Sequence, residues 1–144
     1  DLSGKDFARK MLIIARESGL KLEMEDIVIH PILPEVCLEA QDVSEFYNRL
    51  REQEPYFADL KQKAMENKQV LRYIGSLEKG KVQIKIESVG AEHPFFNLTG
   101  SDNIISVTTQ RYLNNPLVVK GPGAGAEVTA AGVFADIMRA AASF

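Results

Sequence analysis

The chain has 144 residues, of which 45% are hydrophobic and 26% are charged. This length suits one domain of ordinary size, and the balance excludes intrinsically disordered, collagen-like and disulfide-scaffold proteins. The net charge of −3 at pH 7 would not attract phosphate backbones or anionic lipid, so neither nucleic acid nor a membrane is an expected partner. The single cysteine, Cys37, cannot form an internal disulfide, which favours a reducing, cytoplasmic location.

The first strong pattern is a helix over residues 4–18, where apolar residues recur at helical spacing. Ser3 and Asp6 predict a weak capping box at its start, and Gly19 predicts its end. The chain begins at Asp1 without a signal peptide and stops at Phe144 directly after a helical pattern. We therefore expect a domain excised from a longer protein.

The remaining elements alternate between helical and strand-like patterns. Their order predicts an α+β fold in which helices cover one face of a mixed β-sheet. If the other face carries the apolar half of the strands, a second subunit has to cover it, so a homodimer is expected. The expected elements are a short or edge strand within 26–33, helices over 42–52 and 55–68, a hairpin of strands 70–77 and 81–89, strands over 103–110 and 117–120, and a last helix over 125–142.

The first candidate site is the pair of Asp6 and Lys10. Four residues apart on a helix, their side chains rise from one face. An exposed pair would stabilise the helix by about 0.3–0.5 kcal/mol and do nothing else. Lys10 is flanked in sequence by apolar residues, so we expect it to be partly buried, which would suit it to acid–base catalysis beside a carboxylate.

The second candidate is the glycine-rich segment 121–125, which leads from a strand into the last helix. A helix start offers backbone N–H groups to an anionic or amide-rich ligand, although the glycines could equally serve only a tight turn. The spacing is G-x-G-x-G, which is not the dinucleotide fingerprint G-x-G-x-x-G. The small residues of the following helix imply close approach of another element.

The third candidate is the loop that contains His93. A histidine there could titrate or contact a ligand, but a histidine followed by proline is more often a turn and packing feature. Phe95 and Phe96 are interpreted as core or subunit contacts, and Cys37 as a small buried hydrophobe. No residues have the spacing of metal ligands, so no metal site is expected.

Five segments together carry a resemblance to a known family. They are DLSGKDFARKMLIIARESG, IHPILP, KQVLRYIG, HPFFNLTGSDNII and LVVKGPGAGAEVTAAGVFADIMRAA. In this order and spacing they resemble the catalytic part of homoserine dehydrogenase over essentially all of residues 1–144. The ending looks like that of the forms fused to aspartokinase, which stop near this point.

The resemblance implies a dehydrogenase that interconverts aspartate semialdehyde and homoserine with NADP or NAD, on the route to threonine and methionine. Lys10 matches the family's catalytic lysine, Asp6 and Asp1 match substrate-binding residues, and Gly125 matches the last glycine of a loop that touches the cofactor. The resemblance also implies a preceding Rossmann domain on which the last helix packs. Without that domain we expect no activity.

Two other readings stay open from the residues. One is a binding or oligomerisation module that has the fold without the chemistry. The other treats the glycine-rich turn as the phosphate site of an unrelated transferase.

Overall fold

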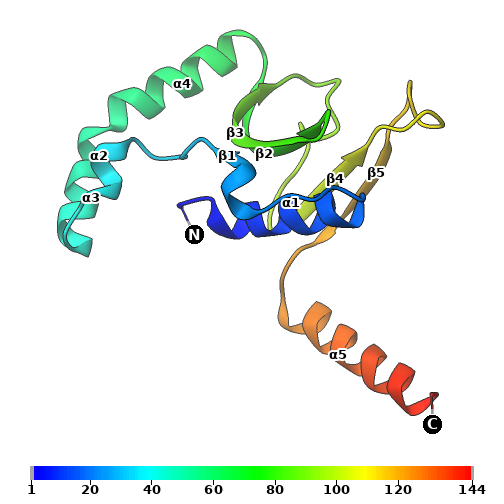
Figure 1. Ribbon diagram of the computed structural model, residues 1–144. Helices are drawn as coiled ribbons and strands as arrows, with labels where there is room; N and C mark the ends of the chain where they lie inside the picture. Colours follow the sequence, from blue (N-terminus) through cyan, green and yellow to red (C-terminus); the bar gives the residue numbers. More distant parts are fainter. Residues whose placement is uncertain (1, 144) are drawn as a thin grey trace. The chain divides into compact units, whose positions relative to one another are not determined.

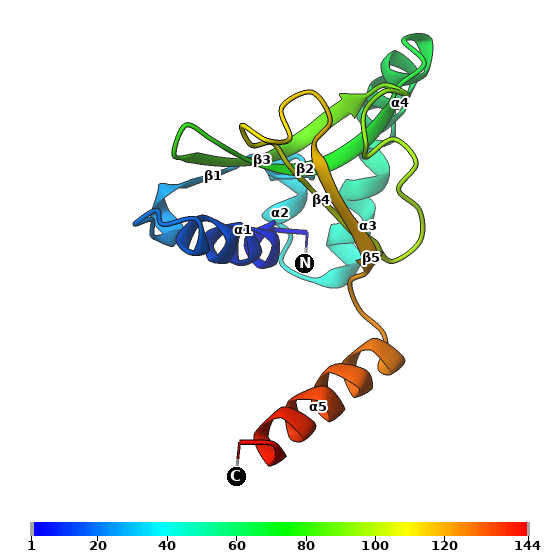
Figure 2. The same ribbon diagram turned by 90° about the vertical axis from the view of Figure 1, so that its right-hand side faces the viewer.

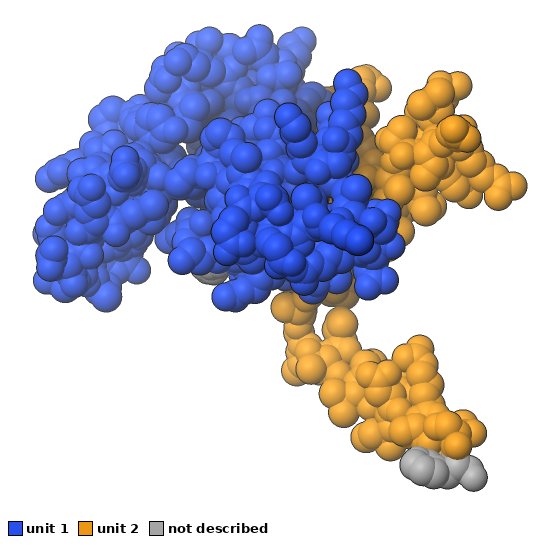
Figure 3. All heavy atoms as spheres, in the orientation of Figure 1, with its two compact units in different colours: residues 1–90 blue, residues 91–144 orange. Residues whose placement is uncertain are grey.

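The computed structural model describes residues 2–143, which form two compact units that divide between Gly90 and Ala91 (Figure 3). The first unit contains α1 (Lys5–Glu17), a 3-10 turn η1 (Met24–Asp26), β1 (Ile27–Ile29), α2 (Glu35–Leu38), α3 (Val43–Glu52), α4 (Glu54–Glu66), β2 (Val70–Glu78) and β3 (Lys81–Val89). The second unit contains β4 (Asp102–Val107), β5 (Leu117–Pro122) and α5 (Ala126–Ala141). Figures 1 and 2 show these elements in two views.

Helix α1 confirms the predicted helix, but not its predicted start. Its N-cap is Gly4, with a left-handed φ of 75° and no side-chain cap, so the prediction of a Ser3–Asp6 capping box is wrong. Its end matches a Schellman motif: the N–H of Gly19 donates to Arg16 O and that of Leu20 donates to Ala15 O. Gly19 has φ 87°, the conformation that this motif requires.

The first unit is built on a mixed three-stranded sheet in the order β1-β3-β2. Strands β2 and β3 form the expected antiparallel hairpin. Its two-residue loop, Lys79 and Gly80, has φ of 50° and 77°, which is the pattern of a type I′ turn. Strand β1 pairs with β3 in parallel. The central strand β3 therefore lies between its hairpin partner β2 and a strand that comes much earlier in the chain.

The core of this unit lies between α1 and the sheet. Val82 and Ile84 of β3 are almost fully buried there, as their strict alternation with polar residues predicts. The other face of β3 carries Lys85 and Glu87, which form an ion pair at 3.6 Å. The homodimer was expected on the condition that this face is apolar, and the ion pair shows that it is not fully so. The burial of this face by a second subunit therefore stays a prediction. The buried members of the core cluster are Ala8, Met11, Leu12, Ala15, Ile27, Val82 and Ile84.

Between β1 and β2 the chain makes a helical excursion, and α3 and α4 lie apart from α1 in both views (Figures 1 and 2). Asp42 caps α3 as expected, since its Oδ1 accepts a hydrogen bond from the Glu45 N–H at 2.8 Å. Pro55 lies in the first turn of α4, also as expected. The predicted strand over 26–33 is shorter, and the four-residue α2 was not predicted. Cys37 of α2 is a fully buried free thiol, as interpreted from its neighbours.

The second unit pairs β4 with β5 as an antiparallel two-stranded sheet. Strand β4 ends three residues before the predicted limit, and β5 continues two residues beyond it. Helix α5 follows with none of its residues buried, and it exposes Val133, Phe134, Ile137 and Met138. Among the described residues, no helix is both long and apolar enough to cross a membrane.

Candidate active site

Lys10 and Asp6 form an ion pair on α1. Lys10 Nζ lies 3.0 Å from Asp6 Oδ2, and both side chains are 57% exposed. The expected pairing is therefore confirmed, but the expectation that Lys10 is partly buried is wrong. At 100° per residue, the buried residues of α1 lie on the opposite side of the helix from this pair.

The exposed face of α1 also carries an apolar side chain. Ile13 lies one turn beyond Lys10 and is 61% exposed, as single apolar side chains on a protein surface often are. A carboxylate, an amine and an aliphatic group therefore follow one another along this face. Such a surface can bind a small polar molecule at the ion pair while a second surface covers Ile13.

The start of α1 further supports the Asp6 carboxylate. Asp6 lies in the first turn of the helix, where the positive end of the helix dipole stabilises a negative charge. Ala8 N–H donates to Gly4 O at 2.9 Å, which begins the helical ladder, and Ser3 Oγ accepts from the Lys5 N–H at 3.3 Å. The sequence-predicted Asp1 lies outside the described residues.

The glycine-rich turn belongs to the second unit. Gly125 is the N-cap of α5, with φ 144° and no side-chain cap, a conformation that favours glycine. A Cβ at Gly123 would overlap the side chain of Asn103, whose strand pairs with the turn through Gly121. Backbone conformation thus favours glycine at position 125, and close packing requires glycine at position 123.

His93 has a local role in the described structure. Its Nδ1 accepts a hydrogen bond from the Phe95 N–H at 3.1 Å, and its ring meets the Phe95 ring edge-on at 4.7 Å between centroids. These contacts agree with the interpretation of His93 as a turn and packing residue. No three His, Cys, Asp or Glu side chains among the described residues are grouped so that they could hold a metal ion.

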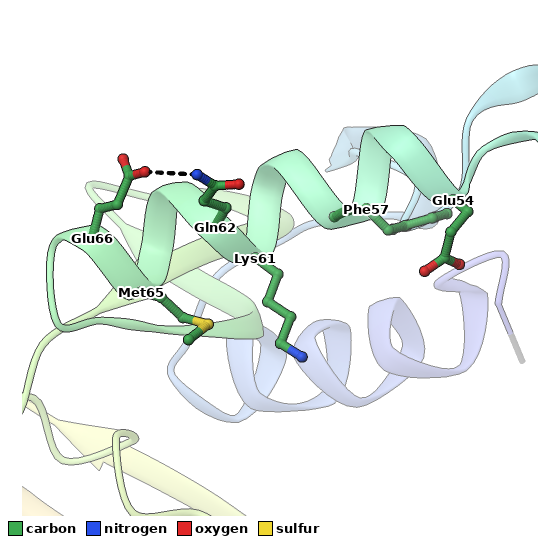
Figure 4. A pocket seen from close by; sticks show the side chains of 7 residues that line it. Glu54, Phe57, Lys61, Gln62, Met65 and Glu66 are labelled. Atoms are coloured by element: carbon green, nitrogen blue, oxygen red, sulfur yellow. Dashed lines mark hydrogen bonds between the residues drawn. The ribbon is translucent and has the colours of Figure 1, made fainter.

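Two hollows of the first unit do not involve the Lys10–Asp6 pair. The larger, about 740 Å³, follows one side of α4 (Figure 4), and Lys61 and Met65 extend from that side. The smaller, about 370 Å³, lies between α2 and α3 and is lined by Cys37 and Phe46. Neither hollow is lined by an acid and a base in ion-pair contact. A second exposed lysine–aspartate pair with the same spacing, Lys63 and Asp59 at 2.7 Å, lies on α4.

Comparison with known proteins identifies the family. A family model described as homoserine dehydrogenase matches residues 1–138. The chain is 46% identical over 143 residues to bifunctional aspartokinase/homoserine dehydrogenase 2, chloroplastic, of Zea mays, covering 98% of this chain and 16% of that protein. It is 39% identical over 144 residues to homoserine dehydrogenase of Saccharomyces cerevisiae, covering 98% of this chain and 40% of that protein. The chain belongs to the homoserine dehydrogenase family.

Solved structures agree with this fold. A Candida auris protein of unknown function matches with a TM-score of 0.86 at 40% identity, over 96% of this chain and 39% of that one. Staphylococcus aureus homoserine dehydrogenase matches with a TM-score of 0.67 at 20% identity, over all of this chain and 32% of that one, which supports the fold alone. The chain thus spans less than half the length of these relatives, and its α+β fold is that of the family's catalytic domain.

Proposed function

We propose that this chain is the substrate-binding and catalytic part of a homoserine dehydrogenase, which interconverts L-aspartate 4-semialdehyde and L-homoserine on the route to threonine and methionine. The family match over residues 1–138 supports the class of enzyme. The observation that carries the proposal is the contact of 3.0 Å between Lys10 and Asp6 on the exposed face of α1. An ammonium group held there can reach a substrate that a second domain brings to this face.

Lys10 is the proton donor of the reduction. Its ammonium donates a proton to the aldehyde oxygen, and in the reverse direction its amine accepts the proton of the hydroxyl group. Asp6 holds the ammonium in place by a charge-assisted hydrogen bond and, with Asp1, binds the polar groups of the substrate. Ile13 and the aliphatic stem of Lys10 would help to exclude water once the face is covered.

The glycine-rich turn has the chemistry to contact a nicotinamide cofactor. A Cβ at Gly125 would have nothing within 4 Å, so this backbone is open to a ligand, and it precedes a helix of 16 residues whose first N–H groups attract anionic groups. NADP or NAD, when bound, supplies or accepts the hydride. Residues 121–125 would line one side of its site, and a nucleotide-binding domain of the parent protein would supply most of the contacts.

The exposed apolar surface supports two further parts of the proposal. Phe134, Ile137 and Met138 give α5 an apolar face, which would pack on the nucleotide-binding domain, and a homodimer would form through the sheet. Since hydride transfer requires a bound and oriented nicotinamide, residues 1–144 alone should have no measurable turnover. The buried free thiol of Cys37 is compatible with a reducing compartment.

The decisive experiment compares two lysines in the full-length enzyme. Lys10→Ala should lower kcat by about 100- to 10,000-fold with little change in KM, as expected for the loss of a general acid. The matched control is Lys63→Ala, because Lys63 is also an exposed helical lysine paired with an aspartate four residues away, at 2.7 Å. It should leave both constants unchanged.

An unchanged kcat in the Lys10→Ala variant would contradict the proposal. It would favour the alternative of a binding or oligomerisation module without catalysis. The other alternative is that the glycine-rich turn is the phosphate site of an unrelated transferase. This hypothesis requires that residues 1–144 alone bind nucleotide, which calorimetric titration tests.

A further inference from the structure

Tyr73 of β2 is packed against the first two turns of α1. Its ring lies 5.7 Å from the Phe7 ring between centroids, at an angle of 59°. Its hydroxyl donates a hydrogen bond at 3.3 Å to the carbonyl oxygen of His30, directly after β1. Tyr73 therefore links β2, the end of β1 and the beginning of α1.

The start of α1 approaches Tyr73 more closely than any residue with a side chain would allow. A Cβ on Gly4 would overlap the Tyr73 hydroxyl oxygen and would lie 2.9 Å from Ile29 Cγ2. Gly4 is also the N-cap of the helix, with φ 75°. Glycine is thus needed at this position both for its conformation and for the contact with the tyrosine.

A second glycine allows α1 to rest directly on β2. A Cβ on Gly75 would lie 2.7 Å from Met11 Sδ and 3.2 Å from Phe7 Cζ. Residues 73 and 75 point to the same face of the strand. Tyr73 and Gly75 together therefore determine how closely α1 packs on the sheet and how the helix is oriented there. The flexible end of Met11 can adjust to a change at Gly75, whereas the Gly4 backbone cannot move without moving the first turn.

Asp6 is the residue most sensitive to this contact. It lies two residues after Gly4 in the first turn of α1, and the first turn of a helix frays unless its N-terminus is held. Lys10 lies in the next turn, where the helix is held by its own hydrogen bonds and by the core contacts of Met11 and Leu12. Loosening of the first turn would therefore move the Asp6 carboxylate relative to the Lys10 ammonium.

We propose that Tyr73 is a positioning residue for the reaction, which holds the Gly4 turn so that Asp6 stays in contact with Lys10. This inference rests on the proposed function, because it concerns how the acid–base pair is kept in place. Tyr73 itself does not touch the pair. Its effect passes through Gly4 and the first turn of α1.

The test is a double-mutant cycle in the full-length enzyme. Tyr73→Leu should lower kcat about tenfold or more, since small misplacements of reacting groups lower rates by such factors. Asp6→Asn should lower kcat at least as much. Because Tyr73 acts through Asp6, the double variant should match Asp6→Asn within about twofold rather than multiply the two losses.

The value of KM separates positioning from general destabilisation. Because Asp6 also binds the substrate in the proposed function, its displacement should raise KM in Tyr73→Leu and in Asp6→Asn alike. A variant that only lowers the amount of folded enzyme would lower the apparent kcat and leave KM unchanged.

Three variants complete the design. Gly4→Ala forces the first turn of α1 away from Tyr73, should reproduce the effect of Tyr73→Leu, and replaces it if that variant does not fold. Tyr73→Phe removes the hydroxyl that meets Gly4 and the His30 carbonyl but keeps the ring contact with Phe7, so it should lower kcat in the same direction as Tyr73→Leu and by a smaller factor. Tyr56→Leu is the matched control, since Tyr56 also contacts a phenylalanine ring, at 5.2 Å between centroids, but on α4. It should change neither kcat nor KM.

The failure of this inference differs from the failure of the proposed function. If Lys10→Ala and Asp6→Asn lower kcat but Tyr73→Leu and Gly4→Ala do not, or if their losses multiply with that of Asp6→Asn, the positioning role is refuted. If Lys10→Ala has no effect on kcat, the proposed function itself fails.

Discussion

Truncation of Ile84 to alanine tests whether the core between α1 and the sheet holds the first unit together. Ile84 is fully buried in the central strand, and its register partners are Ile29 and Gly75. Buried Ile→Ala substitutions lower the free energy of unfolding by about 2–5 kcal/mol, and more where the site cannot collapse. Gly75 has no side chain that could move into the space, so we expect a loss in the upper half of this range, about 3–5 kcal/mol.

The matched control removes the same atoms from the exposed side of α1, the helix that covers this core. Ile13 is 61% exposed, and alanine is the better helix former by a few tenths of a kcal/mol. Ile13→Ala should therefore change the free energy of unfolding of residues 1–144 by less than about 0.5 kcal/mol. Urea unfolding followed by circular dichroism measures both variants, and hydrogen exchange in β3 assigns the effect to the first unit. A loss below about 1 kcal/mol for Ile84→Ala, or equal losses for the two variants, would refute this description of the core.

Two further predictions concern the ends of helices. Gly19→Ala should destabilise the chain by about 1–2 kcal/mol in urea unfolding, because alanine resists the left-handed φ of 87° although its Cβ would meet nothing within 4 Å. Gly90→Ala, equally uncrowded but without a left-handed φ, should not destabilise it, and equal losses would contradict the conformational explanation. Hydrogen bonds from the Gln41 backbone and the Arg49 side chain lower the pKa of Glu45 below its ordinary 4.5. The ionised carboxylate therefore stabilises α3 above about pH 4.5, and this contribution is lost as the pH falls through the lower pKa of the folded state. Carboxyl NMR titration should find the low pKa, Glu45→Gln should remove this part of the pH dependence, and a pKa at or above 4.5 would overturn the assignment.

The locally determined parts of the fold could be predicted from the sequence. The β2–β3 hairpin follows from alternation on both sides of a turn, and α3 follows from Asp42 and a helical apolar pattern. In each case the deciding interactions lie within a few residues. The parallel pairing of β1 with β3 could not be predicted in this way, because it joins residues more than fifty positions apart.

The sequence predicted the contact between Asp6 and Lys10 correctly and the burial of Lys10 wrongly. The spacing of Asp6 and Lys10 was enough to predict their contact, but the apolar residues next to Lys10 in sequence point away from it on the helix. Burial was therefore inferred from the wrong neighbours. Tyr73 and Gly4 were not identified as partners, because their contact depends on how α1 lies on β2. A glycine at the start of an otherwise well-formed helix was the available signal.

The parallel pairing of β1 also affects the order in which the first unit can fold. The β2–β3 hairpin needs only local contacts and can form early, whereas β1 and α1 have to wait for β3 before they can dock. During synthesis, the apolar side of α1 leaves the ribosome about seventy residues ahead of the strand that covers it. Newly made chains would thus expose Met11 and Leu12 for several seconds, which makes nascent α1 a candidate for chaperone binding.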